Sequence, residues 1–242
     1  CKQDRKNYFY PDLPKAYQIS QAEVPLCENG HLDIMVDGKT KTIGVTRIHI
    51  EEDAGKLLHD DSFAGSLVDL NRCGVPLIEI VSEPDIRSVA EAKAYLETIR
   101  SILQYINISD CKMQEGSIRC DVNVSVHKIG EPFGTRCEMK NVNSFSAAIR
   151  GIEFEANRQI EVLENGGIIE QETRRWDDAK GESILMRTKE NANDYRYFPE
   201  PDLLTIVVDE GKIAELKNSL PELPNAKLRR YVDEFGISQN DG

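Results

Sequence analysis

Carboxylates lie at the end of a strand-like stretch, where a rigid backbone could hold them for chemistry. Glu51, Glu52 and Asp53 follow one another there. Three successive acids usually form a solvated turn, but magnesium takes oxygen ligands, and a strand end is a rigid place to hold them. Because side chains alternate along a strand, Glu51 shares a face with His49, and Glu52 lies on the opposite face. The pattern leaves open which of these acids faces a site.

A further carboxylate, Glu79, lies inside the apolar run 75–81 and shares a face with apolar neighbours. Burying a carboxylate among such side chains is costly unless it meets a metal ion or a cation. Two interpretations are equally open. Glu79 is a metal ligand, or it forms a buried ion pair with Arg72 or Arg119.

Basic residues are the second chemical feature. Those that lie in polar or aromatic, motif-like runs are Lys6, Arg47, Lys56, Arg72, Arg119, Lys140, Arg174, Arg175, Arg187 and Arg196. Phosphoryl transfer requires positive charge around the transferred group, together with magnesium. Any single one of these residues is more often an ordinary surface group. The sequence contains no Walker A loop, kinase glycine-rich loop or dinucleotide fingerprint, and no histidine spacing that indicates a nucleophilic Cys or Ser.

Residues 117–126 alternate between apolar and polar side chains, which predicts a strand. Its polar face carries Arg119, Asp121, Asn123 and Ser125. The pattern alone favours a solvated outer face. These short hydrogen-bonding groups would also suit the polar floor of a site, because solvated faces are usually mixtures of Lys, Glu and Thr.

Several other stretches predict strands that would position these residues. Asp37-Gly38 separates 31–36 from 40–52 and is a strong hairpin signal. Later strands are predicted at 75–81, at 135–140, at 168–188 as a hairpin that turns near 178–181, and at 205–208.

Three helices are also predicted. The first begins at Ser88, where Glu91 completes a capping box, and its apolar face comprises Ala92, Leu96, Ile99, Leu103 and Ile106. The second covers 144–164, and its predicted buried stripe comprises Phe145, Ile149, Ile152, Ala156, Ile160 and Leu163. The third lies within 221–235.

The order of strands, helix, strands, helix and strands predicts an α+β fold with a largely antiparallel sheet and helices on one face. A domain boundary is expected between about 209 and 224. Residues 1–215 would form one domain, and 216–242 would begin a helical domain.

Composition narrows the class of protein. A net charge of −12 and a pI of about 4.9 argue against a dedicated nucleic-acid-binding domain. Six cysteines without C-x-x-C spacing and only four histidines argue against a zinc site, and scattered cysteines suit the reducing cytosol. No apolar run approaches the roughly 20 residues of a membrane span, and no signal peptide is recognisable. The opening residues, Cys-Lys-Gln-Asp, suggest an excised segment.

Several long runs occur in the order found in one enzyme family, at 4–12, 14–21, 51–56, 74–87, 115–125, 140–145, 171–174 and 194–202. Together they closely resemble the B subunits of the glutamyl/aspartyl-tRNA amidotransferases, the Gat complexes, over nearly the whole chain. The resemblance implies a cradle-shaped α+β fold akin to glutamine synthetase.

The resemblance also implies a reaction. The B subunits of that family use ATP and Mg²⁺ to phosphorylate the side-chain carboxylate of Glu misacylated onto glutamine tRNA, or of Asp on asparagine tRNA. Ammonia then displaces the phosphate. The implied partners are the amidase subunit of the complex, which takes ammonia from glutamine, its small third subunit, and misacylated tRNA, bound mainly by domains outside this chain. The expected location is the bacterial cytoplasm, with an organelle as the alternative.

By matching motif positions, the resemblance implies Glu52 and Glu79 as magnesium ligands, with Glu51 and His49 as weaker candidates. The implied phosphate-binding and charge-stabilising residues are Lys6, Arg72, Arg119 and Lys140, and the implied nucleotide-binding residues are Lys56 and Arg187. The family's first strand carries a Glu-x-His pair thought to complete the metal site, and none precedes Cys1. The chain alone is therefore expected to fold at least in part without catalysing amidation.

Two other functions fit parts of the sequence. Another ATP-dependent carboxylate–amine ligase on the same fold would act on a free amino acid without tRNA. A non-catalytic RNA-binding or assembly module would bind RNA without ATP and independently of Glu79. The acidic balance and the lack of a basic stripe weigh against the module. Acids beside short polar groups on strands favour a ligase.

Overall fold

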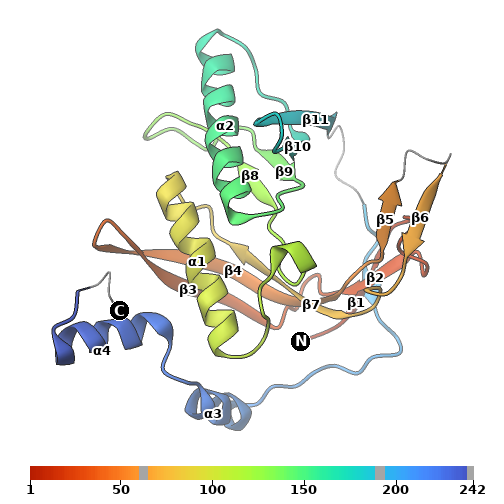
Figure 1. The fold of residues 1–242 in the computed structure, drawn as a ribbon. Coiled ribbons are helices and arrows are strands. Elements are labelled where there is room, and N and C mark those ends of the chain that lie inside the picture. Colours follow the sequence, from red (N-terminus) through yellow and green to blue (C-terminus); the bar gives the residue numbers. More distant parts are fainter. Residues whose placement is uncertain (60–64, 189–193, 239–242) are drawn as a thin grey trace. The chain divides into compact units, whose positions relative to one another are not determined.

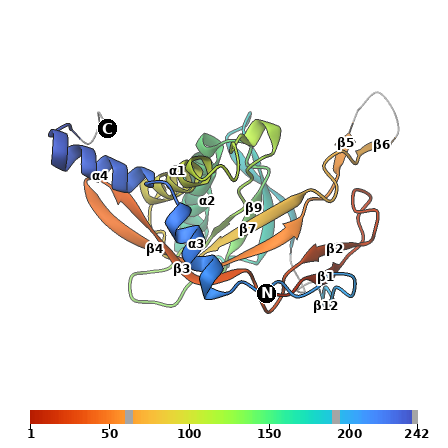
Figure 2. The same ribbon diagram turned by 90° about the horizontal axis from the view of Figure 1, so that it is seen from below.

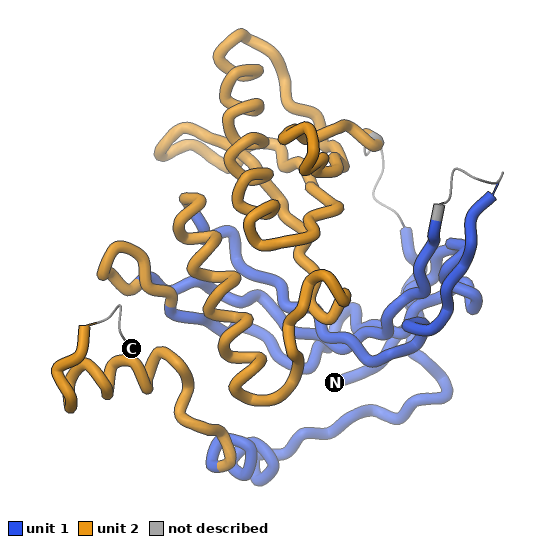
Figure 3. The backbone as a smooth tube through the Cα atoms, in the orientation of Figure 1, with its two compact units in different colours: residues 1–33, 41–86, 193–218 blue, residues 34–40, 87–192, 219–242 orange. Residues whose placement is uncertain are grey.

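The computed structural model describes residues 1–59, 65–188 and 194–238 (Figure 1). The chain divides into two compact units (Figure 3). Unit 1 comprises Cys1–Asp33, Lys41–Ile86 and Asn193–Asn218, and unit 2 comprises Ile34–Thr40, Arg87–Ala192 and Ser219–Gly242. Each unit combines segments that are distant in sequence, so long-range pairing defines both.

A small antiparallel sheet in unit 1 joins the start of the chain to a segment near its end. Its strand order is β12–β1–β2, formed by Phe198–Pro199, Asp4–Asn7 and Tyr17–Ser20. Nε and Nη2 of Arg5 donate to the Glu200 carboxylate at 2.6 and 2.9 Å. Because such two-pronged contacts are both strong and directional, this pair fixes β1 against the later segment.

A second sheet, mostly in unit 1, carries the acidic residues. Its order is β3–β4–β7, formed by Cys27–Val36, Lys39–Glu52 and Pro76–Ser82, which run side by side (Figure 2). Asp37 and Gly38 have φ angles of 49° and 73°, as a tight hairpin turn requires, so the predicted hairpin is confirmed. β4 and β7 are antiparallel, and their register sets His49 opposite Glu79.

A hairpin and a helix also belong to unit 1. The hairpin pairs β5 (Lys56–His59) with β6 (Ser66–Asp69), and α3 covers Glu210–Ser219 without burying a residue. The prediction of a strand at 205–208 is wrong, because only Ile206 exchanges backbone hydrogen bonds there, with Cys1 at 2.7 and 3.0 Å.

Unit 2 is built on a four-stranded sheet in the order β11–β10–β9–β8. These strands cover Glu182–Thr188, Glu172–Asp177, Cys137–Lys140 and Val122–Val124. β9 and β10 are parallel, and the other two pairs are antiparallel. The short 3-10 helix Met113–Glu115 precedes β8.

Helix α2 (Phe145–Glu164) lies along this sheet (Figure 1). α1 (Val89–Tyr105) packs beside α2, and α4 (Pro224–Phe235) contacts α1. The buried core of the unit comprises Met139, Val142, Ala147, Ala148 and Trp176, with Leu96, Val122 and Phe154 packed against it.

Two predicted helix starts are confirmed by their caps. The Ser88 Oγ accepts a hydrogen bond from the Glu91 backbone N–H at 3.2 Å, and the Ser144 Oγ accepts one from the Ala147 N–H at 3.0 Å. Each serine therefore satisfies a backbone donor that the helix itself leaves unpaired.

The predicted buried stripe of α2 is wrong. The buried residues are Ala147, Ala148, Gly151, Glu155 and Gln159, whereas Ile160 and Leu163 are 42% and 44% exposed. Glu155 and Gln159 can be buried because hydrogen bonds satisfy them, and the small residues allow close approach of the helix to the sheet.

The strand predicted over 117–126 is shorter in the structure, where β8 covers only Val122–Val124. An α+β fold with antiparallel pairing is confirmed, but the described residues form four sheets rather than one. α3 lies within the segment expected to hold a domain boundary, and the two-domain division stays a prediction. Among the described residues, none of the helices combines the length and the apolarity that a bilayer crossing requires.

Candidate active site

Three side chains from β4 and β7 converge in unit 1. The nearest ligand atoms of His49, Glu51 and Glu79 all lie within 4.8 Å of one another. The His49 Nε2 lies 2.6 Å from Glu51 Oε1 and 3.3 Å from Glu79 Oε2. His49 and Glu51 share a face of β4 because they are two residues apart, and the register of β7 adds Glu79 from the opposite strand.

The cluster opens to solvent on the Glu79 side. The His49 side chain is 3% exposed and that of Glu51 is 9% exposed, whereas the Glu79 side chain is 51% exposed. The sequence had suggested a buried Glu79, and the structure corrects this. Within unit 1, the charged partner of Glu79 is His49 rather than Arg72.

The close contacts in the cluster shift the pKa values of His49 and Glu79. Burial lowers the pKa of His49, but hydrogen bonds to Glu51 and Glu79 outweigh this and raise the pKa to about 9. The same contact with His49, opposed by burial, lowers the pKa of Glu79 to about 2. Near neutral pH an imidazolium therefore lies between two carboxylates. The buried His49 Nδ1 has no hydrogen-bond partner in the described residues.

Strand β2 supplies a second layer around Glu51. The Gln18 Nε2 donates to Glu51 Oε2 at 3.1 Å and to the Glu52 backbone oxygen at 2.8 Å. The Ser20 Oγ lies 3.4 Å from Glu51 Oε1. The Tyr8 hydroxyl donates to Gln18 Oε1 at 3.2 Å, and burial together with the charge of Glu51 raises the pKa of Tyr8 to about 12. The Tyr8 hydroxyl therefore keeps its proton near neutral pH and can donate it to Gln18 in a hydrogen bond.

Glu52 lies outside this cluster. Its Oε1 accepts from the Ile19 N–H at 3.0 Å and forms an ion pair with Lys15. Alternation along β4 explains the separation, because Glu51 and Glu52 point to opposite faces. Sequence reasoning missed Lys15 and Gln18, although both lie in the run 14–21 that carried the family resemblance.

The other predicted residues of unit 1 lie around β4. The Arg72 Nε lies 3.4 Å from Asp53 Oδ2, and the guanidinium donates to the backbone oxygens of Ala54 and Gly55 at 3.2 and 3.0 Å. Arg72 therefore holds the turn after β4. The Lys6 Nζ lies 4.7 Å from the centre of the Tyr195 ring, and its charge contributes to the low pKa of Glu79. Lys56 is exposed at the start of β5.

The remaining predicted residues belong to unit 2. The Lys140 Nζ lies 3.4 Å from Glu138 Oε1 and 3.7 Å from Asp121 Oδ2. Arg119 precedes β8. The Arg187 backbone pairs with Thr173, but the Arg187 side chain lies outside the described part of the structure. The predicted residues are thus divided between the two units.

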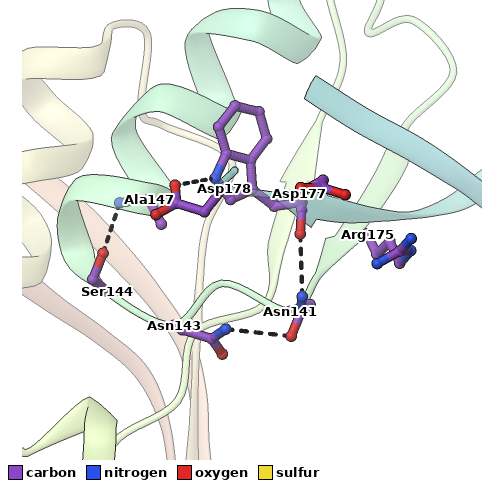
Figure 4. A pocket seen from close by; sticks show the side chains of 8 residues that line it. Asn141, Asn143, Ser144, Ala147, Arg175, Asp177 and Asp178 are labelled. Carbon is purple, nitrogen blue, oxygen red and sulfur yellow. Dashed lines mark hydrogen bonds between the residues drawn. The ribbon is translucent and has the colours of Figure 1, made fainter. Parts of the chain in front are cut away.

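Unit 2 also contains a polar cavity of about 170 Å³ at the start of α2 (Figure 4). Its lining includes Asn143, Asp177 and Arg175. Asn141 adopts a left-handed conformation with φ of 63°, and its Nδ2 donates to the Trp176 backbone oxygen at 3.1 Å. These contacts fix the loop between β9 and α2.

A family model and individual relatives all point to the same protein family. The model of the "GatB/GatE catalytic domain" family matches residues 1–214. The B subunit of the aspartyl/glutamyl-tRNA(Asn/Gln) amidotransferase of Caldicellulosiruptor bescii is 66% identical over 241 residues, covering 99% of this chain and 50% of that protein. The corresponding B subunit of Lachnoclostridium phytofermentans is 61% identical over 242 residues, covering 100% of this chain and 51% of that protein. The chain thus spans about half the length of these curated relatives.

Proposed function

Because the chain belongs to the GatB/GatE catalytic domain family, we propose that it carries the carboxylate-activating site of a tRNA-dependent amidotransferase. The reaction would phosphorylate the side-chain carboxylate of Glu or Asp carried by tRNA, with ATP as phosphoryl donor. Ammonia would then displace the phosphate and leave an amide. The His49–Glu51–Glu79 cluster is the observation that carries this proposal.

The donor set of the cluster fits a divalent cation, and Mg²⁺ is the proposed ion. Carboxylate oxygens from Glu51 and Glu79 are the ligands that a hard cation prefers. An imidazole is a less usual ligand for magnesium, so the two carboxylates would hold the ion, and His49 would keep them in place. Bound magnesium would offset negative charge on the phosphates of ATP. Glu52 would join the ligands only after release from Lys15.

Basic residues would supply the positive charge that phosphoryl transfer requires. Lys6 would offset negative charge near the cluster, since its charge already acts on Glu79. Arg72 would act mainly by holding the turn after β4. The residues proposed to contact phosphate groups or the nucleotide from other parts of the chain are Arg119, Lys140, Lys56 and Arg187.

The names of the relatives favour a multi-subunit assembly. We infer an amidase partner that releases ammonia from glutamine, a small third subunit, and misacylated tRNA as substrate. The proposed setting is the bacterial cytoplasm. The proposed fold relationship is to glutamine synthetase, which also makes an acyl phosphate that ammonia attacks.

A direct test uses the full-length protein assembled with its partner subunits. Conversion of glutamyl-tRNA to glutaminyl-tRNA is measured with and without ATP and Mg²⁺, for the wild type and for Glu79→Gln. The expected result is ATP- and Mg²⁺-dependent amidation that Glu79→Gln reduces by at least about 100-fold, because one of two carboxylate ligands is lost.

Glu97→Gln serves as the control, since Glu97 is a surface carboxylate on α1 that pairs with Lys93 at 4.0 Å. It should leave the rate unchanged. Full activity of Glu79→Gln would remove the cluster from the mechanism. Amidation of free glutamate, without tRNA, would replace the proposal with another carboxylate–amine ligase.

A further inference from the structure

A second cavity, of about 390 Å³, lies in unit 1 and is lined by Asn7, Tyr8, Phe9, Ala16, Arg196 and Phe198. Its volume falls within the usual range for sites that bind small organic groups, about 300–1,000 Å³. Phe9 is 80% exposed and Phe198 is 45% exposed. Large apolar rings thus border the cavity and are accessible to a ligand.

The walls of this cavity are fixed by backbone contacts. The Asn7 Nδ2 donates to the Arg196 backbone oxygen at 2.7 Å, and the Tyr8 N–H donates to the Ala16 oxygen at 3.2 Å. Ala16 and Arg196 have φ angles of 59° and 46°. Residues with a Cβ rarely adopt this conformation, and such strain clusters at ligand sites. The cavity is therefore preorganised.

Arg196 lines the cavity together with the rings. In the described part of the chain, the Arg196 guanidinium has no ion pair or hydrogen bond, although the chain carries a net charge of −12. The Lys6 Nζ lies 4.7 Å from the Tyr195 ring centre. Exposed aromatic faces next to such cations are typical of sites that stack an unpaired nucleobase and bind its phosphate.

The cavity connects to the carboxylate cluster through two hydrogen bonds. Tyr8, in the cavity wall, donates to Gln18 at 3.2 Å, and Gln18 donates to Glu51 at 3.1 Å. In an aminoacyl-tRNA the amino acid is esterified to the ribose of the terminal nucleotide. Only that ribose and a short amino acid therefore separate the terminal base from the carboxylate that reacts.

We propose that this cavity binds the unpaired terminal nucleotide of the aminoacyl-tRNA. The base stacks on Phe9 and Phe198, and the 5′-phosphate lies beside Arg196. This assignment rests on the proposed function, and it gives the site a way to recognise the RNA end near the chemistry.

The test uses the full-length protein in its complex and a tRNA whose terminal adenine is replaced by the fluorescent analogue 2-aminopurine. Stacking on an aromatic ring quenches this fluorophore. The wild type and Phe9→Trp should quench it on binding, whereas Phe9→Leu, which keeps only the Phe198 ring of the stacking pair, should quench it clearly less. Because Phe9 is exposed, the substitution to Leu should leave the fold intact.

Steady-state kinetics provide a second readout. Phe9→Leu should raise the KM for misacylated tRNA by about tenfold or more, as loss of one stacked base does, and leave the KM for ATP unchanged. Arg196→Gln should also weaken tRNA binding and reduce its salt dependence by about one phosphate contact. Phe133→Leu, which alters an exposed ring that does not line the cavity, should change neither constant.

Unchanged quenching in Phe9→Leu would overturn the assignment. A rise in the KM for ATP, without a change for tRNA, would overturn it as well and would assign the cavity to the free nucleotide. If the wild type binds and quenches the labelled tRNA but amidates none, the proposed function fails while the cavity assignment stands. If the wild type amidates and Phe9→Leu behaves as the wild type, only the cavity assignment fails.

Discussion

Gln18 determines where the Glu51 carboxylate points. Its amide nitrogen contacts both Glu51 Oε2 and the Glu52 backbone oxygen, and its amide oxygen is held by Tyr8. Side chains that orient a ligand in this way are often nearly as important for metal affinity as the ligand itself.

Gln18→Leu should therefore weaken the proposed magnesium site without removing a proposed ligand. The substitution leaves a buried carboxylate short of one donor, which costs about 1–3 kcal/mol. The Mg²⁺ concentration for half-maximal amidation should rise by about tenfold or more. Gln114→Leu, on an exposed residue, is the matched control. An unchanged magnesium dependence in Gln18→Leu would mean that Glu51 does not contact the ion.

Glu155 is the buried charge that α2 carries into the core of unit 2. It is 0% exposed, and it accepts hydrogen bonds from Arg158 at 2.7 and 2.9 Å and from Gln159 and Ser183 at 2.9 and 3.0 Å. Burial raises the pKa of this carboxyl, but the contacts with Arg158, Gln159 and Ser183 outweigh burial and lower the pKa below its usual range.

This lowered pKa sets the direction of a pH effect. A carboxyl with a depressed pKa in the folded state stabilises the fold above its unfolded pKa, and the stabilisation is lost as pH falls through the folded value. Glu155→Gln should lower the free energy of unfolding by roughly 3 kcal/mol at neutral pH, because the partly buried Arg158 and Arg174 lose a counter-charge. The difference from the wild type should shrink in acid.

Denaturant unfolding at neutral and acidic pH measures this effect. Glu161→Gln is the control, because Glu161 is exposed on the same helix and its loss should change the unfolding free energy by less than about 0.5 kcal/mol. Equal losses for Glu155→Gln at both pH values would contradict the assigned role of its charge.

At the scale of elements, α2 presents a polar and small-residue face to its sheet and leaves an apolar face partly exposed. Gln159 donates to the Val124 oxygen at 3.0 Å and accepts from the Val126 N–H at 3.2 Å. These bonds tie the helix to backbone groups at the end of β8 and just beyond it.

Because the buried face of α2 differs from the predicted one, substitutions on its two faces should have opposite effects from those expected from periodicity. Ala148→Leu should destabilise the protein by about 1–3 kcal/mol, because Ala148 is 0% exposed and the added atoms have no space. Leu163→Lys should change the unfolding free energy by less than about 0.5 kcal/mol. Denaturant unfolding of both variants checks this. The reverse ranking would restore the stripe expected from periodicity.

Local signals predicted elements well. The Ser88 capping box and the Asp37-Gly38 turn act within four residues of chain, so the sequence displays them directly. The buried face of α2 could not be read in this way, because it depends on which polar side chains find partners. The truncated β8 likewise depends on pairing with β9 rather than on alternation.

At the scale of the whole molecule, the sequence predicted the class of fold but not the number of sheets. The apolar surroundings of Glu79 left a metal ligand and a buried ion pair equally open, and the family resemblance named Glu79, Glu51 and His49 as candidate ligands. Alternation along the strand placed His49 and Glu51 on one face. Lys15 and Gln18 were missed because they contact Glu52 and Glu51, which are distant in sequence. Tyr8 was missed because it acts through Gln18. Local sequence patterns also could not predict that the basic residues would be divided between two units.

The pairing of β1 with β12 also governs when unit 1 can mature during synthesis. Roughly 180 residues separate Ser20 from Phe198, and ribosomes add about 5–20 residues per second. The β1–β2 hairpin therefore waits about 10–40 seconds for its third strand and for Glu200. The 87–192 segment of unit 2 emerges within that interval and can form its own core first. A chaperone that shields the waiting hairpin would act at this stage.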